Sequence, residues 1–356
     1  MGLIKKEIKK LTWAISIQEN RGHRASMKSE FQEMPELRER IRALSGRKIW
    51  PPVRDILLTW GTIAMALWVA HRFELTRIGT LVWIICGVVI ATRQLALGIL
   101  MHEQSHRGLF ANQKWNMIIS NLFFSYPLGL STRLYRRSHG PHHEAPSTSF
   151  DPTYKIQKLD PGFGKEKTKT QMIRMLILDG IGVNGPKIMF AAWALWSPFP
   201  RLFVPSVSKI GGLSKFEKFD FIAFWALAFS LIAYFGLFKE FFFLWMVPYL
   251  TLLMLMLRMR GLLEHPATPH AKLIESTFHV DLNWVERFFF APMNSHYHLA
   301  HHLFAGVPYY HLNQLHEILM KEKAYEVYGA RFKGITNLEK GVLWTHLEAP
   351  KLGRAG

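Results

Sequence analysis

Eight histidines of this chain stand in three tight clusters, and an imidazole can act as a metal ligand or as an acid and base near neutral pH. The clusters use spacings of one, three and four positions. Their members are His102 and His106, then His139, His142 and His143, and finally His298, His301 and His302. The last two clusters share the pattern H-x-x-H-H.

Residues three and four positions apart lie on one face of a helix, so each cluster can direct two or three imidazoles at one point. That geometry predicts metal binding. Imidazole binds iron, zinc, copper and nickel alike, so the ligand type leaves the metal open. The single cysteine, Cys86, lies in an apolar run, which excludes a cysteine-based metal site or a disulfide framework.

A ninth candidate ligand is His265, which follows an apolar stretch in the sequence Arg-Gly-Leu-Leu-Glu-His. Eight or nine neutral imidazoles are too many for one ion but suit two. Ligating histidines usually hold their second ring nitrogen against an acidic or polar group. The candidates for that role are Glu264, Asp281, Glu103, Glu144 and Asp151, and Asn294 is a candidate to hold a water near one metal.

Long apolar runs surround these clusters and predict a membrane protein, since 49% of the residues are hydrophobic. Four runs are about long enough to cross a hydrocarbon core of roughly 30 Å. They form two predicted hairpins, Val53–Ala70 with Ile78–Leu100 and Phe221–Phe238 with Phe241–Leu257. Two shorter stretches, Met117–Leu130 and Ile188–Pro200, favour interfacial or re-entrant segments.

The distribution of positive charge predicts the orientation. Residues 1–54 are rich in lysine and arginine, whereas the turn between the first two spans holds only Arg72 and Arg77, so we expect a cytoplasmic N-terminus. Two crossings return the chain to the cytoplasm before His102, and four return it there before His265. All histidine clusters are then on the cytoplasmic side.

Lysine and arginine outnumber aspartate and glutamate by 44 to 26, which gives a formal net charge of +18. Such an excess can indicate nucleic-acid binding. Beside membrane spans it is better explained by the positive-inside bias and by anionic headgroups, so we expect no nucleic-acid partner. Arg93 lies inside the second span, and we expect it to pair with a carboxylate or with backbone carbonyls.

The clusters resemble the three histidine boxes of the membrane fatty acid desaturase and hydroxylase superfamily. The matching segments are His102-Glu-Gln-Ser-His106, His139-Gly-Pro-His142-His143 and His298-Leu-Ala-His301-His302. The flanks agree as well, in Arg93-Gln-Leu-Ala-Leu-Gly-Ile-Leu-Met-His102 and in Asn294-Ser-His-Tyr-His298. The resemblance covers roughly residues 90–320.

The resemblance implies a non-haem di-iron oxidoreductase that uses O2 on a fatty acyl or similar lipid chain. By position, the eight box histidines would be iron ligands, and His265 matches the extra histidine between the second and third boxes. Desaturation is the expected reaction, and hydroxylation of a lipid, hydrocarbon or carotenoid-like substrate is the alternative. A fused cytochrome b5 signature is absent, which implies a separate ferredoxin- or cytochrome b5-type electron donor and favours a bacterial inner membrane over an endoplasmic reticulum.

Several positions depart from particular subgroups. The first box is H-x-x-x-H, shorter than the box of acyl-CoA Δ9 desaturases, and position 298 is histidine where many front-end desaturases have glutamine. The motif of alkane hydroxylases is matched only at Glu264 and His265. These departures weaken the resemblance to each of those subgroups.

Two other classes of protein also fit part of the pattern. The sequence His102-Glu103-Gln-Ser-His106 is literally H-E-x-x-H, in which two histidines would bind zinc and the glutamate would act as the general base of a membrane protease. That site leaves most of both H-x-x-H-H clusters unexplained. A metal or haem carrier, or a transporter, could also present histidines at a membrane surface, but transport favours ionisable groups within the spans.

The expected architecture is an all-α integral membrane protein, with four transmembrane helices in two hairpins and a cytoplasmic helical cap that holds a di-iron site. We expect a basic cytoplasmic or interfacial segment at residues 1–52, a membrane desaturase domain at residues 53–320 and a cytoplasmic tail at residues 321–356.

Overall fold

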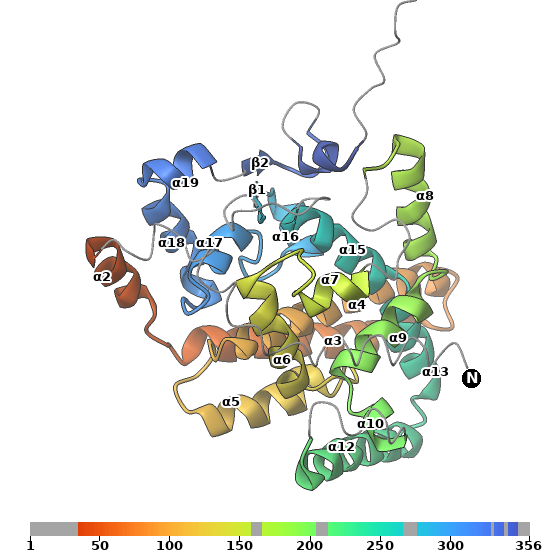
Figure 1. Cartoon of the computed structure of the whole chain (residues 1–356). Helices are drawn as coiled ribbons and strands as arrows, with labels where there is room; N and C mark the ends of the chain where they lie inside the picture. Colours follow the sequence, from red (N-terminus) through yellow and green to blue (C-terminus); the bar gives the residue numbers. More distant parts are fainter. Residues whose placement is uncertain are drawn as a thin grey trace, which may run out of the picture.

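The computed structural model describes residues 35–157, 166–203, 213–265, 276–328, 331–337 and 341–347. Most of them are helical (Figure 1). The sheet in these residues consists of β1 (His279–Asp281) and β2 (Arg331–Lys333), which pair in parallel. The predicted all-α character therefore agrees with the structure. Of the predicted basic segment, residues 1–34 lie outside the described residues.

Helices α3 (Trp50–Phe73) and α4 (Gly79–Ser105) form an antiparallel hairpin, and both are long and apolar enough to cross a membrane. Pro51 and Pro52 occupy the first turn of α3, where proline is tolerated because the N–H groups there have no partner within the helix. The hairpin agrees with the first predicted pair of spans. The last turns of α4 are buried and carry the first histidine cluster.

A third apolar stretch runs from Phe238 to Glu264 and also meets the criteria for a membrane span. It combines α13 (Phe238–Glu240), the π-helix η4 (Phe241–Met246), α14 (Val247–Leu250) and α15 (Leu252–Glu264). It covers the fourth predicted span and continues to the residue before His265.

The third predicted span, Phe221–Phe238, falls on α12 (Lys215–Tyr234), which ends at a turn containing Gly236 with φ +68°. α12 is not among the helices apolar enough to span a membrane, because its first turns carry Lys215, Glu217, Lys218 and Asp220. Its remaining residues are mostly apolar and mostly exposed. The structure thus has three candidate spans in the described residues, or four if a bent pair is included.

That bent pair is α8 (Lys169–Gly180) and α9 (Gly185–Trp196), which meet at 73°. α9 covers most of the predicted re-entrant stretch. Gly185 lets the pair approach α14, since a Cβ at this position would lie only 1.8 Å from the carbonyl oxygen of Leu250. The other short stretch falls on α5 (Gln113–Ser120) and the π-helix η3 (Asn121–Ser125), each too short to cross a bilayer.

Most of the remaining elements surround the histidine-bearing segments, whereas Phe199–Phe203 lies beside α12, where the rings of Phe199 and Phe221 pack with centroids 5.0 Å apart (Figure 1). The remaining elements are α2 (Pro35–Leu44), α6 (Thr132–Glu144), α7 (Pro152–Gln157), α10 (Phe199–Phe203), α16 (Trp284–Phe290), α17 (His298–Leu303), η6 (Tyr309–His311), α18 (Leu312–Leu319), α19 (Lys323–Tyr328) and η7 (Val342–His346). The main core cluster joins Leu97 and Leu100 of α4 to Met256 of α15 and to Leu299 of α17. This packing fixes the histidine-bearing elements relative to one another.

Arg93 differs from the expectation. Its Nε donates a hydrogen bond to Thr92 Oγ1 over 3.2 Å, and its guanidinium lies 5.0 Å from the centre of the Phe288 ring. Neither neighbour is a carboxylate or a carbonyl, so the predicted pairing is wrong for the described residues.

Candidate metal centre

The structure brings the nine predicted ligands together from four separate elements. His102 and His106 come from the end of α4, His139, His142 and His143 from α6, His298, His301 and His302 from α17, and His265 from the residue after α15. They form two groups, and within each group one ligand nitrogen per residue lies within 4.8 Å of all the others.

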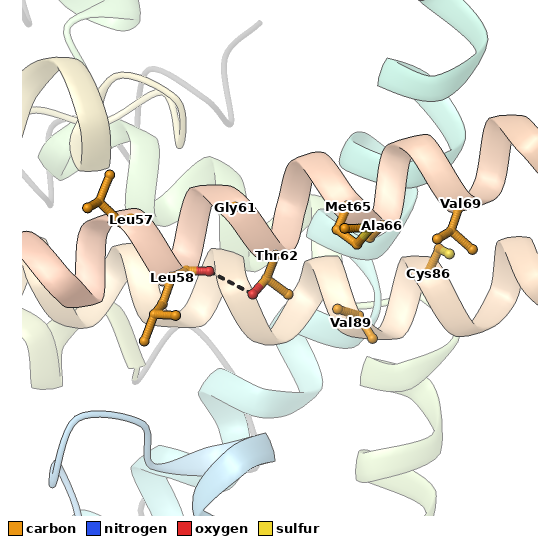
Figure 2. Close-up of a pocket in the computed structure, with 9 residues that line it drawn as sticks. All are labelled: Leu57, Leu58, Gly61, Thr62, Met65, Ala66, Val69, Cys86 and Val89. Atoms are coloured by element: carbon orange, nitrogen blue, oxygen red, sulfur yellow. Dashed lines mark hydrogen bonds between the residues drawn. The ribbon is translucent and has the colours of Figure 1, made fainter.

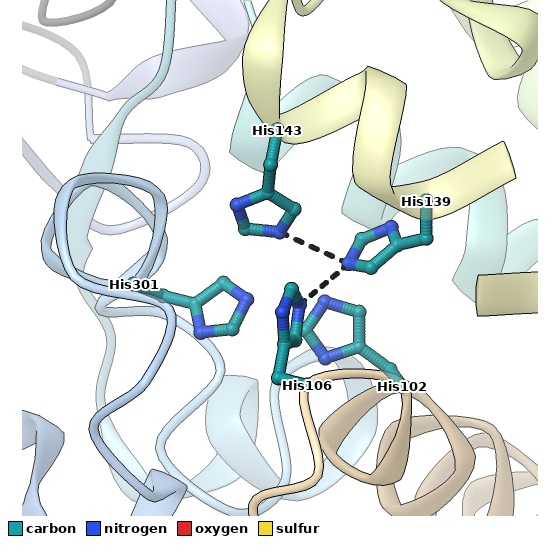
Figure 3. Close-up of side chains that lie close together, drawn as sticks. All are labelled: His102, His106, His139, His143 and His301. Carbon is teal, nitrogen blue, oxygen red and sulfur yellow. Dashed lines mark hydrogen bonds between the residues drawn. The ribbon is translucent and has the colours of Figure 1, made fainter. Parts of the chain in front are cut away.

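The first group contains five histidines, His102, His106, His139, His143 and His301 (Figure 3). His139 Nε2 lies 2.9 Å from His106 Nε2 and 3.0 Å from His143 Nε2. Figure 3 shows the five rings converging from three directions on one small volume. Several nitrogens meeting at such distances suit a shared cation.

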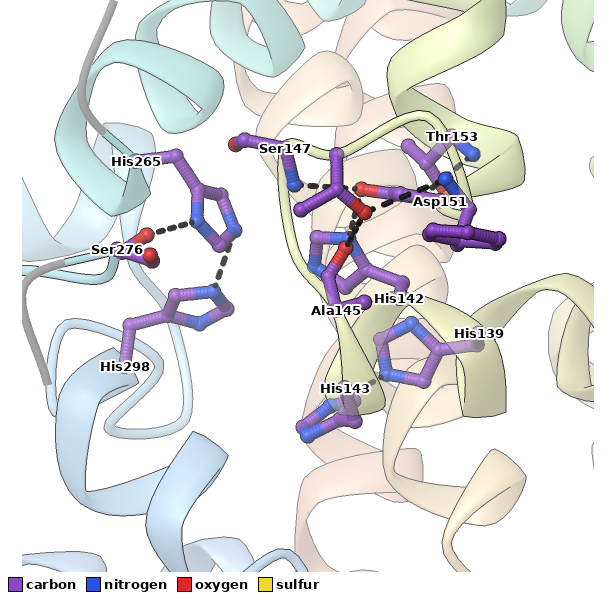
Figure 4. Close-up of polar contacts among 12 residues, drawn as sticks. His139, His142, His143, Ala145, Ser147, Asp151, Thr153, His265, Ser276 and His298 are labelled. Carbon is purple, nitrogen blue, oxygen red and sulfur yellow. Dashed lines mark hydrogen bonds and ion pairs between the residues drawn. The ribbon is translucent and has the colours of Figure 1, made fainter. Parts of the chain in front are cut away.

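The second group contains four histidines, His142, His265, His298 and His302. His298 Nε2 lies 3.1 Å from His265 Nε2. His142, which comes from α6, lies across from these two rings (Figure 4). The two groups touch, since the rings of His143 and His302 stack with centroids 4.0 Å apart. Both H-x-x-H-H clusters contribute to both groups, so the arrangement offers two adjacent metal positions.

Burial of these rings leaves several nitrogens without a partner. His102, His139, His142, His298, His301 and His302 are all buried. Among the described residues, no hydrogen-bond partner lies at His102 Nε2 or at either ring nitrogen of His301 and of His302. A buried polar atom without a partner costs free energy. Metal binding would satisfy these atoms, so the residues present fit a pair of imidazole-bound ions.

The same burial keeps most of the ligands neutral. Burial lowers the pKa of His106 and of His265 to about 3, and it holds the pKa of His139 and His301 well below the ordinary value. A neutral imidazole has a lone pair available for a metal. The electrostatics of the site therefore prepare it for cations rather than for imidazolium groups.

Oxygen atoms hold the second ring nitrogen of several histidines (Figure 4). His142 Nδ1 donates to Asp151 Oδ2 over 2.8 Å, and His265 Nδ1 donates to the Ser276 carbonyl over 2.8 Å. His298 Nδ1 lies 3.7 Å from Glu264 Oε1. With Nδ1 of His142 and of His265 occupied in this way, Nε2 is the nitrogen left for a metal in these two residues.

Asp151 is itself fixed by backbone groups, because it accepts hydrogen bonds from the N–H groups of Ser147 and Thr153. Burial opposes ionisation of Asp151, yet His142 and the backbone hydrogen bonds of Ser147 and Tyr154 lower its pKa below the ordinary value. Burial likewise opposes protonation of His142, but Asp151 raises the pKa of His142. In the metal-free protein both shifts favour an ion pair of His142 and Asp151, which fixes the orientation of the ring.

Glu103, the glutamate of the H-E-x-x-H sequence, is also engaged. Its Oε1 lies 3.3 Å from His102 Nδ1, and its Oε2 accepts a hydrogen bond from the Tyr309 backbone N–H over 3.1 Å. A carboxylate with both oxygens in use orients a ligand rather than activating water. Because each group also gathers more than the three protein ligands of a catalytic zinc site, the protease hypothesis loses its support.

The other predicted supporting residues have different neighbours. Asp281 Oδ1 accepts from His279 Nε2 over 2.8 Å, and His279 belongs to neither group. Asn294 Nδ2 donates to the Tyr309 carbonyl over 3.2 Å. Glu264 also forms an ion pair with Arg260. Of the three, the structure places Glu264 beside a histidine of the two groups.

Arg136 is a positioning residue that the sequence reasoning missed. From α6 its guanidinium donates to the carbonyl groups of Ser105 and Gln104, over 2.9 and 2.8 Å, at the end of α4. It therefore holds the first histidine cluster against the second. Its place three residues before His139, on the same helix face, was the signal available in the sequence.

Two other features of the described residues lie away from the centre. His71, Glu74 and Glu240 gather at the far end of α3, where Glu74 is already paired with Lys239. An apolar pocket of about 440 Å³ runs along the outer face of α3 and α4 and includes Cys86 (Figure 2). It contains no histidine or carboxylate.

Comparison with known proteins agrees with this geometry. The sequence model described as fatty acid desaturase matches residues 78–334, which is more than half of the chain and includes all nine histidines. A curated relative, the dihydrorhizobitoxine desaturase of Bradyrhizobium elkanii, is 25% identical over 265 residues, which cover 70% of each chain.

Proposed function

This chain belongs to the fatty acid desaturase family, and from that membership we propose that it desaturates a fatty acyl chain with O2 at two irons held by the nine histidines. The observation that carries the proposal is the division of these histidines into adjacent groups of five and four. Family membership makes the chain an oxidoreductase and favours iron among the metals that imidazole binds.

In the proposed reaction two hydrogen atoms leave neighbouring carbons of the acyl chain, and O2, two electrons and two protons are converted with them into two waters. When bound, the irons would supply the oxidant that removes hydrogen from an unactivated CH2 group. The protein's own residues position that chemistry. His102, His142 and His265 are oriented by hydrogen bonds at Nδ1, and burial keeps bulk water away from the rings.

We further propose four membrane crossings with every histidine cluster on the cytoplasmic side. Contacts at both ends of α12 support its place as the third span. At its start, Arg133 of α6 donates to Glu217 over 2.7 Å, which ties this end to the histidine-bearing cap. Near its other end, the turn into α13 lies beside the turn between α3 and α4, through the ion pair of Lys239 and Glu74.

The electrons would come from a separate ferredoxin- or cytochrome b5-type protein, attracted by the net charge of +18. We propose a bacterial inner membrane as the location. We also propose that the chain consists of a basic segment at residues 1–52, a membrane desaturase domain at residues 53–320 and a tail at residues 321–356. Hydroxylation by the same centre is the second candidate reaction. The relative's name favours desaturation, and because it specifies dihydrorhizobitoxine, a substrate outside the fatty acids is a second candidate too.

The test is metal stoichiometry in detergent-purified protein, followed by product analysis. We expect about two irons per chain in the wild type and a sharp loss in His142→Ala. His311→Ala is the matched control, because His311 contacts Gln314 and belongs to neither group. One tightly held zinc that is indifferent to His142 would overturn the proposal. Mass spectrometry of lipids then separates desaturation, a loss of two hydrogens, from hydroxylation, a gain of one oxygen.

A further inference from the structure

Arg93 has no negatively charged neighbour in the described part of the chain, although it stands in the middle of an apolar helix. The guanidinium contacts Thr92 Oγ1 and the Phe288 ring, and the residue is half-buried. The acidic residue of α16 cannot serve it, because both oxygens of Glu286 accept backbone hydrogen bonds elsewhere, from Asn283 and Ile335. A half-buried guanidinium in apolar surroundings is stabilised by an anion beside it.

The position of Arg93 along α4 places it near a membrane surface. A hydrocarbon core of roughly 30 Å takes about 20 residues of helix, so α4, which begins at Gly79, leaves the core near Ile99. Arg93 lies six residues before that point, or about 9 Å. Because arginine can extend its charged end towards the headgroups, the guanidinium lies nearer the boundary on the side of the histidine clusters, where Phe288 of α16 contacts it.

Helix α16 supplies the second half of this site. It packs against α4 and α15, it has no buried residue, and it exposes Trp284, Val285 and Phe288. A short helix with exposed aromatic residues beside a membrane span is suited to lie at the bilayer interface. Phe288 connects α16 to α4, because its ring lies over the guanidinium of Arg93.

From these observations we propose that Arg93 and α16 form a binding site for the phosphate of a lipid headgroup. The planar guanidinium presents paired N–H donors that match two phosphate oxygens. The exposed aromatic side chains of α16 would pack against the upper acyl chain of the same lipid. This inference rests on the proposed membrane placement of α4, but it does not depend on the reaction at the irons.

The experiment is native mass spectrometry of delipidated protein with defined lipids added back. Phosphatidylglycerol carries the phosphate, and diacylglycerol of the same acyl chains lacks it. We expect wild type to retain phosphatidylglycerol and to prefer it to diacylglycerol. Arg93→Gln should need about tenfold more phosphatidylglycerol for the same occupancy, while Arg93→Lys, which keeps the charge without the paired donors, should be intermediate. Arg77→Gln, in the turn at the far end of α4, is the matched control and should bind as wild type.

Equal retention by wild type and Arg93→Gln, or equal retention of the two lipids by wild type, would overturn the proposal. Inorganic phosphate is the competitor that separates the sources of the anion, and release of the lipid by about 10 mM phosphate would show a free-anion site instead. Phe288→Ala removes the ring and keeps the charge, so it should weaken binding less than Arg93→Gln if the phosphate is the main contact, and a larger loss would contradict the proposal. Iron content and unfolding temperature report whether each variant is folded.

Failure of the membrane placement is visible separately. If wild-type protein leaves the membrane fraction in alkaline carbonate, then the placement of α4 is wrong whatever the variants bind. If it stays there and Arg93→Gln binds normally, then only the lipid site fails.

Discussion

Hydrogen bonds to one ring nitrogen decide which nitrogen of each histidine can meet a metal. In His142 the Nδ1–H donates to Asp151, and in His265 it donates to the Ser276 carbonyl. Each bond removes the freedom of the ring to turn and directs Nε2 towards the neighbouring imidazoles. The carboxylate of Asp151 also makes the imidazole more basic, which strengthens a ligand bond.

Asp151→Asn should therefore weaken metal binding without emptying the site completely. The amide keeps the shape of the side chain but removes the charge beside His142, and such a change typically lowers affinity about 10- to 100-fold. Metal content after dialysis against graded chelator measures the effect. Asp281→Asn is the matched control, because Asp281 contacts His279 and none of the nine histidines. Equal metal loss in both variants would contradict the role given to Asp151.

The buried histidines also predict how the stability of the metal-free protein depends on pH. Burial lowers the pKa of His106 and His265 to about 3, whereas a histidine in the unfolded chain has a pKa near 6.5. Between these values the unfolded chain binds more protons at these two positions, so the contribution of His106 and His265 to stability is constant above about pH 6.5 and falls as the pH drops towards 3.

Each such histidine should contribute a loss of about 1.4 kcal/mol per pH unit within that window. Thermal unfolding of metal-free protein at pH 7.5, 6.5 and 5.5 measures this slope. Replacing His106 with glutamine should make the slope shallower. A transition temperature that rises from pH 6.5 to 5.5 would be incompatible with neutral buried imidazoles.

The spacing of the histidines predicted their meeting but not their division into groups. His139 and His143 are four positions apart and share a group, as helical periodicity indicates. His142 belongs to the other group because its ring points from a different side of α6, towards α17 and His265. Such a partition depends on where distant elements pack, and so does the choice of Asp151 over Asp281 as the carboxylate beside a ligand. No local sequence pattern predicts the division into two groups or the choice of carboxylate.

At the scale of elements, side chains from one helix fix the ends of another. Arg136 of α6 donates to the last carbonyl groups of α4, which have no partner within that helix. Farther along the chain, the buried Asp179 of α8 accepts from Arg258 of α15 over 2.7 Å and from Asn184 over 2.7 Å. The first contact aligns two histidine clusters, and the second holds the bent α8–α9 pair against the span that leads to His265.

Asp179→Ala should consequently destabilise the protein strongly. Removing one member of a buried ion pair typically costs about 3–5 kcal/mol, because the remaining charge loses its partner without regaining water. Unfolding in detergent by temperature or denaturant gives the change in stability. Lys239→Ala breaks the exposed ion pair with Glu74, and it should cost no more than about 1 kcal/mol. Similar losses in the two variants would show that Asp179 contributes no more than a surface charge.

The elements also show which predictions from hydropathy are secure. The hairpin of α3 and α4 was predictable because both helices are longer than 20 residues and predominantly apolar, with mean hydropathy 1.4 and 2.0 over their most apolar windows. α12 is harder to assign, since its first turns mix four charged residues with apolar ones. Glu217 accepts a hydrogen bond from Arg133, and Asp220 accepts one from the Tyr126 hydroxyl. These two acidic residues therefore make tertiary contacts that the sequence alone does not predict.

At the scale of the whole molecule, the histidine groups restrict how often the chain can cross a membrane. In the sequence, His142 comes before the bent α8–α9 pair, α12 and the stretch Phe238–Glu264, and His265 comes after them. The two rings nevertheless lie with centroids 4.9 Å apart. The number of crossings between them must therefore be even. If the candidate span Phe238–Glu264 supplies one, then among the described residues either α12 or the bent α8–α9 pair supplies the other. The contact of Arg133 with Glu217 favours α12, because it keeps the start of α12 beside α6.

Cysteine labelling in intact cells separates these two topologies, and the single natural cysteine makes the background simple to prepare. In a Cys86→Ala chain, one cysteine is placed at Leu75, Lys114, Lys215 or Leu237 and treated with a membrane-impermeant maleimide. If α12 is the span, Leu75→Cys and Leu237→Cys react from outside, whereas Lys114→Cys and Lys215→Cys react only after permeabilisation. If the bent pair is the span, Lys215→Cys reacts from outside while Lys114→Cys does not, and our assignment of α12 is wrong. Since Leu237→Cys is external in both cases, its failure to react would contradict the even number of crossings itself.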